Sequence, residues 1–357
     1  MRLGEEAAGE VYDCSRAPEP ARADMSDGEV WAGVMARTLE RLDAACTGTA
    51  APEPGLLSEA RRSLASVVTE IEVRLADGRA LHAYDTRADR DAGGPGAPGS
   101  PTAVFWLHGS PNVGSPPEPL FAAAEANGLR WVSYDRPGYG GSSPHDGRTV
   151  SSAAADVAAV ADALGIGRFA VLGHSGGGPH ALACAALLPE RVIAAVSVSA
   201  PAPFDANGLD WFAGWSPGIA AENRAAVGGR AALEAHWAEA EPEDMGAFFT
   251  EADIAALDGS WSWLADVAGQ AMQQGSEGLA EDTLAAVRPW GFWPSAISVP
   301  VLIMHGARDK MVPCAHGEWL AARCPAAELR AVPDAGHITV LDSAPQALQW
   351  LAARVRA

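Results

Sequence analysis

The feature that most limits the possible folds is an alternation of short apolar runs with alanine-rich helical segments. The apolar runs are four to seven residues long: Ala103–Leu107, Arg130–Tyr134, Phe169–Leu172, Val192–Val198, Val301–Met304 and Glu328–Val332. The helical segments are Leu120–Asn127, Ser151–Leu164, Gly178–Leu188, Gly317–Arg323 and Ala344–Val355. Continuous apolar strands that alternate with helices predict an α/β fold, in which helices cover both faces of a parallel sheet.

Two further strands precede this alternation. Residues Val67–Val73 and Ala80–Tyr84 flank the pair Asp77-Gly78, a typical hairpin turn. We therefore expect a mostly parallel sheet of about eight strands that begins with an antiparallel hairpin.

The interval from 203 to 293 interrupts the alternation. It contains no strand pattern, but Arg230–Ala240 and Phe248–Leu257 have helical spacing. Seven of the twelve tryptophans lie there, and 15 acidic side chains against three arginines contribute −12 of the net charge of −20. We expect a helical cap inserted between strands 6 and 7. The domains would then be an extension at 1–60, core at 61–202, cap at 203–293 and core at 294–357.

The N-terminal extension and the cysteines bear on localisation. The first 30 residues contain no apolar leader segment. Residues 1–24, rich in Ala, Glu, Pro and Arg without clear periodicity, predict a mobile tail, and Val30–Leu42 has helical spacing. Five scattered cysteines without a Cys-x-x-Cys pair predict free thiols rather than a zinc site or a disulfide framework. We expect a reduced, cytoplasmic protein.

The charge and the apolar distribution exclude several partners. A net charge of −20 repels nucleic acid and anionic membrane surfaces, and no apolar stretch reaches 18 residues. We expect a monomer or homodimer that acts on a small-molecule substrate, with no nucleic acid or membrane partner.

The strongest chemical motif is Gly173-His174-Ser175-Gly176-Gly177, which follows an apolar strand and precedes a helical segment. In this context G-x-S-x-G predicts a nucleophile elbow, a strained turn that presents the serine at a helix N-terminus. The glycines are expected because side chains at their positions would collide with the strand or the helix. Ser175 is the candidate nucleophile.

A serine hydroxyl needs a base, which in turn needs an acid to orient it. His337 is the best-placed base, because Gly336-His337 follows the last strand run, although His108, His174 and His305 also lie at strand ends. The order Ser…Asp…His favours Asp309, which follows the Val301–Met304 run. Asp205, after the Val192–Val198 run, is the alternative acid, and Asp135 is expected to serve loop structure.

Acyl transfer also requires hydrogen-bond donors for an oxyanion. The backbone N–H of Gly176 follows the nucleophile directly. The second donor is expected from His108-Gly109-Ser110-Pro111, with the N–H of Ser110 the natural choice.

These motifs together resemble the α/β-hydrolase superfamily from about Ser66 to the C-terminus. Five occur in the expected order: His108–Pro111, Asp135–Ser142, Gly173–Gly177, Gly306–Asp309 with Val312-Pro313, and Gly336-His337. The first two also resemble motifs of epoxide hydrolases and haloalkane dehalogenases, which carry an aspartate at the elbow, whereas Ser175 favours acyl transfer. The capped arrangement is similar to carboxylesterases, prolyl-type aminopeptidases, carbon–carbon bond hydrolases and cofactor-free haloperoxidases.

The leading hypothesis is a carboxylic ester hydrolase that forms an acyl-serine and needs no cofactor or metal. The aromatic residues expected to line an apolar substrate pocket, or else to form the core of the cap, are Trp211, Phe212, Trp215, Trp261, Trp263 and Phe292. An aminopeptidase or amidase is the alternative, with Glu222, Glu234 or Glu239 receiving a substrate ammonium group. A non-catalytic protein that binds a small hydrophobic ligand is the third possibility.

Overall fold

A single eight-stranded sheet forms the centre of the protein. The computed structural model describes residues 68–86, 100–240, 244–273 and 275–356. The strands are β1 Thr69–Arg74, β2 Ala80–Asp85, β3 Thr102–Leu107, β4 Leu129–Tyr134, β5 Phe169–His174, β6 Val192–Val198, β7 Val301–Gly306 and β8 Ala327–Val332.

The strand order is β1-β2-β4-β3-β5-β6-β7-β8. Strand β2 pairs antiparallel with both β1 and β4, and every other pairing is parallel. The predicted mostly parallel sheet with an initial hairpin is therefore confirmed. The carboxyl ends of β3 to β8 consequently meet at one edge of the sheet.

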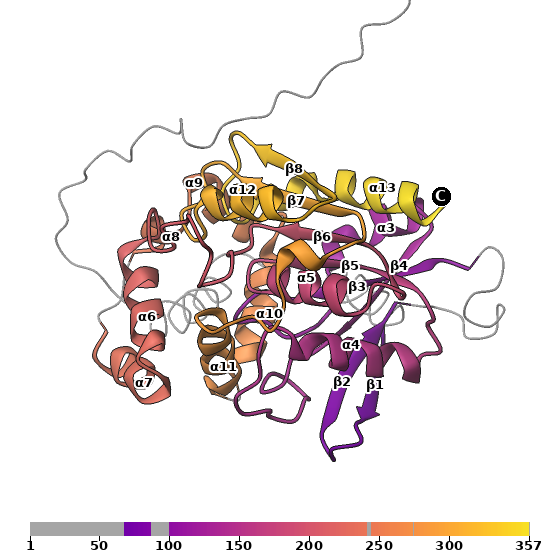
Figure 1. Ribbon diagram of the computed structural model, residues 1–357, viewed down its shortest axis with the longest axis horizontal. Coiled ribbons are helices and arrows are strands. Elements are labelled where there is room, and N and C mark those ends of the chain that lie inside the picture. The colour runs from indigo at the N-terminus through magenta and orange to yellow at the C-terminus, as the bar shows by residue number, and fades with distance from the viewer. Residues whose placement is uncertain (1–67, 87–99, 241–243, 274, 357) are drawn as a thin grey trace, which may run out of the picture.

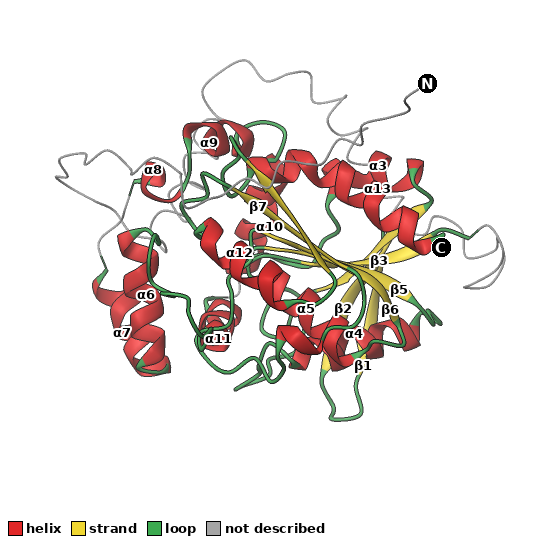
Figure 2. Ribbon diagram, turned by 45° about the horizontal axis from the view of Figure 1, so that its top comes forward, coloured by secondary structure: helices red, strands yellow, loops and turns green. Residues whose placement is uncertain are grey.

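Helices cover both faces of the sheet (Figures 1 and 2). Helices α4 (Ser152–Ala163), α5 (Gly177–Leu187) and α12 (Cys314–Arg323) pack on one face, and α3 (Phe121–Ala126) and α13 (Ala344–Val355) on the other. Among the described residues, short 3₁₀ helices lie at Glu118–Leu120, Pro294–Ala296 and Thr339–Ser343.

Strand β3 shows why continuous apolar runs become central strands. Successive side chains point to opposite faces, so Phe105 and Leu107 join one core cluster, while Val104 and Trp106 join the other. All four are fully buried because helices lie on both sides. An alternating polar pattern would leave polar groups in one of these cores.

In the described part of the interval between β6 and β7 lie six helices, which we call the cap helices. They are α6 Pro217–Val227, α7 Arg230–Glu239, α8 Met245–Phe248, α9 Glu251–Leu257, α10 Ser262–Met272 and α11 Glu277–Ala286. Figure 1 shows α6, α7 and α11 beside one end of the sheet.

The pattern at Phe248–Leu257 is divided between two helices. Phe248 ends α8, and α9 begins at Glu251 because Thr250 and Asp253 form a reciprocal capping box. The expected single helix was therefore wrong at its N-terminal end, where the side chain of Thr250 accepts a hydrogen bond from Asp253 N.

Some expectations concern residues outside the described ranges, among them the tail at 1–24 and the helix at Val30–Leu42. Cys184 and Cys324 are buried free thiols. Cys314 is disulfide-bonded, so the expectation of free thiols is wrong for that residue. No helix within the described ranges combines the length and apolar character needed to cross a bilayer.

Candidate active site

Ser175 lies in a strained turn between β5 and α5. Its φ of 53° is in the left-handed region, which costs energy for a residue other than glycine. A Cβ on Gly173 would lie 2.2 Å from the carbonyl oxygen of Gly177, and one on Gly177 would lie 1.9 Å from that of Leu107. Both glycines are thus required sterically, and the turn presents Ser175 at the N-terminus of α5.

His337 and Asp309 come from the loops after β8 and β7. His337 Nδ1 lies 2.8 Å from Asp309 Oδ2, and both side chains are buried. The other carboxylate oxygen, Oδ1, accepts hydrogen bonds from the N–H groups of Met311 and Val312, each at 2.9 Å. Asp205, the alternative acid, is exposed in the loop after β6.

The charge state of Asp309 follows from these contacts. Burial alone would raise the pKa of its carboxyl, but the attraction of His337 and its hydrogen bond outweigh burial and lower the pKa. Asp309 therefore remains an anion that can stabilise an imidazolium.

The N–H groups of Ser110 and Gly176 lie in adjacent loops. A Cβ built on Gly176 would lie 3.5 Å from Ser110 N and 2.5 Å from Ser110 Oγ. Gly109 approaches the nucleophile closely, since its Cβ would lie 3.5 Å from Ser175 Cβ. The predicted oxyanion donors are therefore beside the candidate nucleophile.

Two cavities meet at Ser175. The first, with about 870 Å³ of empty space that is partly open to solvent, lies beneath α6 and α11 and includes Gly176, Trp211, Trp215 and Glu222 in its wall. The second, of about 760 Å³, lies near α9 and α10 and includes His337. Both are lined by Ser110, Pro111, Ser175 and Met311.

Of the six expected aromatic wall residues, Trp211 and Trp215 line the first of these two cavities, and the other four line neither. The other four pack elsewhere: Phe212 against Phe204 and Arg224, Trp261 with its indole N–H on Asp342, Trp263 against Trp106, and Phe292 against Trp290. Of the expected carboxylates, Glu222 lines the first cavity, whereas Glu234 and Glu239 are exposed.

The three other histidines at strand ends are held by backbone groups. His108 Nε2 accepts a hydrogen bond from Arg136 N, and the ring nitrogens of His174 and His305 contact the carbonyl oxygens of His337 and Val312. Burial lowers the pKa of all three, that of His174 to about 3. None of them contacts a carboxylate as closely as His337 contacts Asp309.

Asp135 serves loop structure, as expected. Its carboxylate accepts hydrogen bonds from Gly114 N at 2.6 Å, from Gly141 N at 2.9 Å and from the hydroxyl of Tyr84. These contacts connect the loops after β3 and β4.

The sequence interpretation missed two buried carboxylates of the cap helices, Asp253 on α9 and Asp282 on α11. Asp253 accepts hydrogen bonds from the loop that carries His337, and Asp282 contacts the hydroxyl of Ser110. The cap region holds fifteen acidic residues. The spacing of Thr250 and Asp253 is typical of a helix start, but no local signal indicates which of the fifteen are buried. Only the fold shows which carboxylates are buried.

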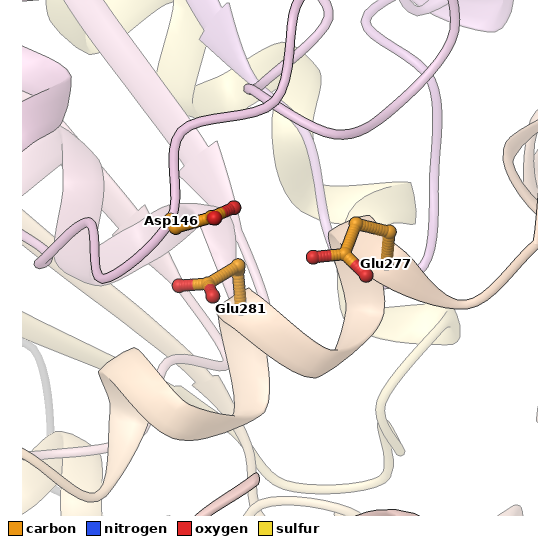
Figure 3. Close-up of side chains that lie close together, drawn as sticks. All are labelled: Asp146, Glu277 and Glu281. Atoms are coloured by element: carbon orange, nitrogen blue, oxygen red, sulfur yellow. The ribbon is translucent and has the colours of Figure 1, made fainter.

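One group of carboxylates in the described ranges could share a cation: Asp146, Glu277 and Glu281, with one oxygen of each within 4.8 Å of the others (Figure 3). The guanidinium of Arg230 donates to Glu277 at 3.1 Å and also to Glu281. Because this side chain already supplies positive charge, we assign no metal there.

Comparisons with known proteins identify the family and the fold. Residues 102–344 match the model of a family described as alpha/beta hydrolase fold. A 2-hydroxymuconate semialdehyde hydrolase of Pseudomonas putida is 29% identical over 274 residues, which are 75% of this chain and 90% of the relative.

Solved structures give the same result for the fold. The enol-lactonase of Burkholderia xenovorans LB400 aligns with a TM-score of 0.57 at 22% identity, covering 81% of this chain and 100% of its own. A thermophilic esterase from Thermogutta terrifontis aligns with a TM-score of 0.55 at 22% identity, covering 81% and 98%. At these identities the two structures establish a shared fold.

Proposed function

The chain belongs to the α/β-hydrolase family, and on this basis we propose that it is a serine hydrolase that cleaves a carboxylic ester through an acyl-Ser175 intermediate. The observation that carries the proposal is the 2.8 Å contact between Asp309 Oδ2 and His337 Nδ1, in a chain whose elbow presents a serine. No cofactor is required for this chemistry.

The proposed reaction follows from the tautomer of His337. Asp309 accepts a hydrogen bond from the N–H at Nδ1, so that the proton of the neutral imidazole stays on Nδ1. Nε2 is then free to take the proton of the Ser175 hydroxyl as its oxygen attacks the ester carbonyl. The N–H groups of Ser110 and Gly176 stabilise the oxyanion. Nε2 then returns the proton to the leaving alcohol, and water releases the acid by the same steps.

The two cavities would divide the substrate between them. The leaving alcohol must lie near His337 to receive its proton, and His337 lines the second cavity only. The acyl group would then occupy the first cavity, which Gly176 lines. Both cavities can hold a sizeable group, so we propose a substrate with two substantial and largely apolar halves.

The curated relative is named for 2-hydroxymuconate semialdehyde, a carboxylate. Within the described ranges, neither cavity is lined by a lysine or arginine, so neither offers a cation to such an anion. We therefore favour a neutral ester over that substrate.

Covalent labelling with a fluorophosphonate tests the mechanism. We expect the wild-type protein to be labelled and Ser175→Ala to remain unlabelled. A wild-type protein that does not react would refute the serine mechanism and favour a non-catalytic ligand-binding protein.

The isomers ethyl octanoate and octyl acetate test the division of the substrate. Ala286→Phe should narrow the first cavity and mainly slow ethyl octanoate, whereas Ala268→Phe should narrow the second and mainly slow octyl acetate. The opposite pattern would reverse the assignment.

An aminopeptidase or amidase is the second candidate, because Glu222 lies in the wall of the first cavity. Its carboxylate accepts a hydrogen bond from the indole N–H of Trp237 at 3.0 Å and could also receive an ammonium group. Turnover of amino-acid anilides far above that of p-nitrophenyl esters, lost in Glu222→Gln, would establish this alternative.

A further inference from the structure

The loops that carry His337 and Ser110 are both held by carboxylates of the cap helices. We propose that Asp253 and Asp282 are positioning residues, the first for the general base and the second for the Ser110 oxyanion donor. The proposal rests on the serine-hydrolase function proposed above. Under this proposal the cap helices both cover the proposed catalytic site and position two of its loops.

Asp253 lies at the third position of α9 and is fully buried. Its Oδ1 accepts hydrogen bonds from Ile338 N at 3.0 Å and from Thr339 N and Oγ1 at 2.8 and 2.9 Å. Its Oδ2 accepts one from His337 N at 3.2 Å. One carboxylate therefore binds three consecutive N–H groups, beginning with that of the general base.

The loop approaches this carboxylate so closely that only glycine fits beside it. A Cβ on Gly336 would lie 1.9 Å from Asp253 Oδ2. The Gly336 N–H donates to Thr339 Oγ1, which itself donates to Asp253 Oδ1. The side chain of Asp253 thus fixes the backbone on both sides of His337, directly or through Thr339. Asp309 fixes the imidazole ring of His337.

Only a carboxylate suits this position. All the groups that face Asp253 here are donors, including Thr250 N at 3.1 Å on Oδ2. An asparagine has one acceptor oxygen, so its NH₂ group would face donors on the other side. The loop would have to move, although the side chain has nearly the same shape.

Asp282 holds the oxyanion loop in a similar way. Its Oδ2 accepts hydrogen bonds from the Ser110 hydroxyl, from Arg136 Nη2 and, at 2.9 Å, from the Tyr139 hydroxyl. Its Oδ1 lies 3.1 Å from Arg136 Nε and 2.6 Å from Arg148 Nη2. Burial would raise the pKa of this carboxyl, but the two arginines hold it well below its usual range.

Arg136 binds the other residues of the oxyanion loop, His108 and Gly109, as well as Ser110. Its guanidinium is buried and donates to the carbonyl oxygens of His108 and Gly109 and to Ser110 Oγ. The pair Arg136–Asp282 therefore binds three consecutive residues, the last of which carries the proposed oxyanion donor. A shift of about 1 Å in such a donor is enough to lower a rate about 100-fold.

The variant Asp253→Asn tests the first half of the proposal. We expect kcat for a p-nitrophenyl ester and the rate of fluorophosphonate labelling to fall about 100-fold, with KM changed less than about threefold. Thr250→Ala is the matched control, because it breaks the same capping box without removing a contact to the His337 loop. Thr250→Ala should lower the thermal midpoint and leave kcat near wild type.

A double variant shows whether Asp253 acts through His337. In a His337→Ala background, Asp253→Asn should lower the residual kcat no further. A further 100-fold loss in that background, or equal losses of kcat in Asp253→Asn and Thr250→Ala, would refute the positioning role. If Asp253→Asn does not fold, Thr339→Val removes one of its hydrogen bonds and should lower kcat severalfold at unchanged KM; an unchanged kcat would refute the role.

Binding of a trifluoromethyl ketone, which forms an oxyanion on Ser175, tests the second half. Ser110→Ala keeps the backbone donor but loses the hydroxyl that binds Asp282, and we expect about 10-fold weaker inhibition and a similar loss of kcat. Asp282→Asn should act in the same direction and add little to Ser110→Ala. Unchanged inhibition in Ser110→Ala would refute the role of Asp282.

These results are separable from a failure of the proposed function. If wild-type protein neither reacts with fluorophosphonate nor hydrolyses esters, the serine mechanism itself is wrong. If wild type reacts and the variants match it, the mechanism stands and the positioning proposal fails.

Discussion

Replacing Asp309 by asparagine should inactivate the protein through the tautomer of His337. Oδ1 of Asp309 accepts two backbone hydrogen bonds, from Met311 and Val312. The amide oxygen of an asparagine must take this place, because its NH₂ group cannot accept them. The NH₂ group would then face His337 Nδ1, which has to become an acceptor and leave its proton on Nε2.

An imidazole with its proton on Nε2 cannot accept the proton of Ser175. The equivalent change in Ser-His-Asp enzymes lowers kcat by about 10⁴, which corresponds to about 5.4 kcal/mol in the activation barrier. We expect a loss of this size at neutral pH with little change in KM, since Asp309 lines neither cavity. Steady-state hydrolysis of a p-nitrophenyl ester measures it, and circular dichroism monitors folding.

Asp205→Asn is the control, because this exposed residue occupies the other position at which the acid could lie. It should retain wild-type kcat. The reasoning is refuted if folded Asp309→Asn stays within tenfold of wild type, or if Asp205→Asn loses as much.

Three further outcomes are expected. Gly177→Ala should yield no folded protein, because its Cβ would lie 1.9 Å from the oxygen of Leu107; a soluble variant with a wild-type thermal midpoint would contradict this. Leu172→Ala, at a fully buried position, should lower the free energy of unfolding in urea by about 3 kcal/mol, whereas a loss below about 1 kcal/mol would show that the core repacks. Burial raises the pKa of Glu222, so the folded state keeps a proton that the unfolded chain releases near pH 4.3, and stability falls as pH rises above that value. Glu222→Gln should therefore raise the thermal midpoint more at pH 8 than at pH 4. An equal rise of the midpoint at the two pH values would contradict a raised pKa of Glu222.

The sheet could be predicted from sequence because its signal is local. The run Phe169–Leu172 is apolar throughout, and Val192–Val198 is apolar except for the buried Ser197, because strands buried on both faces have no side that faces solvent. Observed β6 has the expected bounds. The helix expected at Gly317 begins three residues earlier, at Cys314, directly after its N-cap residue Pro313. The residue at which a helix begins depends on the loop before it, which the helical spacing does not describe.

The cap was harder to predict because burial there depends on packing between distant segments. Trp261 and Trp263 are of a residue type that is common in pocket walls. In the structure, the indole N–H of Trp261 donates to Asp342, and Trp263 packs against Trp106. Ser175 and His337 could be chosen because their places at strand ends put them at one sheet edge. Asp253 could not, since its hydrogen-bond partners in the His337 loop lie more than 80 residues away in sequence.

The contacts of Asp253 and Asp282 bear on how such proteins can be recombined. A cap insertion looks exchangeable, because it begins and ends in loops between two strands. Here the contacts between cap and core include both loops that carry the proposed catalytic groups. A transplanted cap without these two carboxylates would therefore leave the Ser110 hydroxyl and the N–H groups of 337–339 without their acceptors. Chimeras that change cap specificity should therefore retain α9 and α11 with the core and vary α6, α7 and α10.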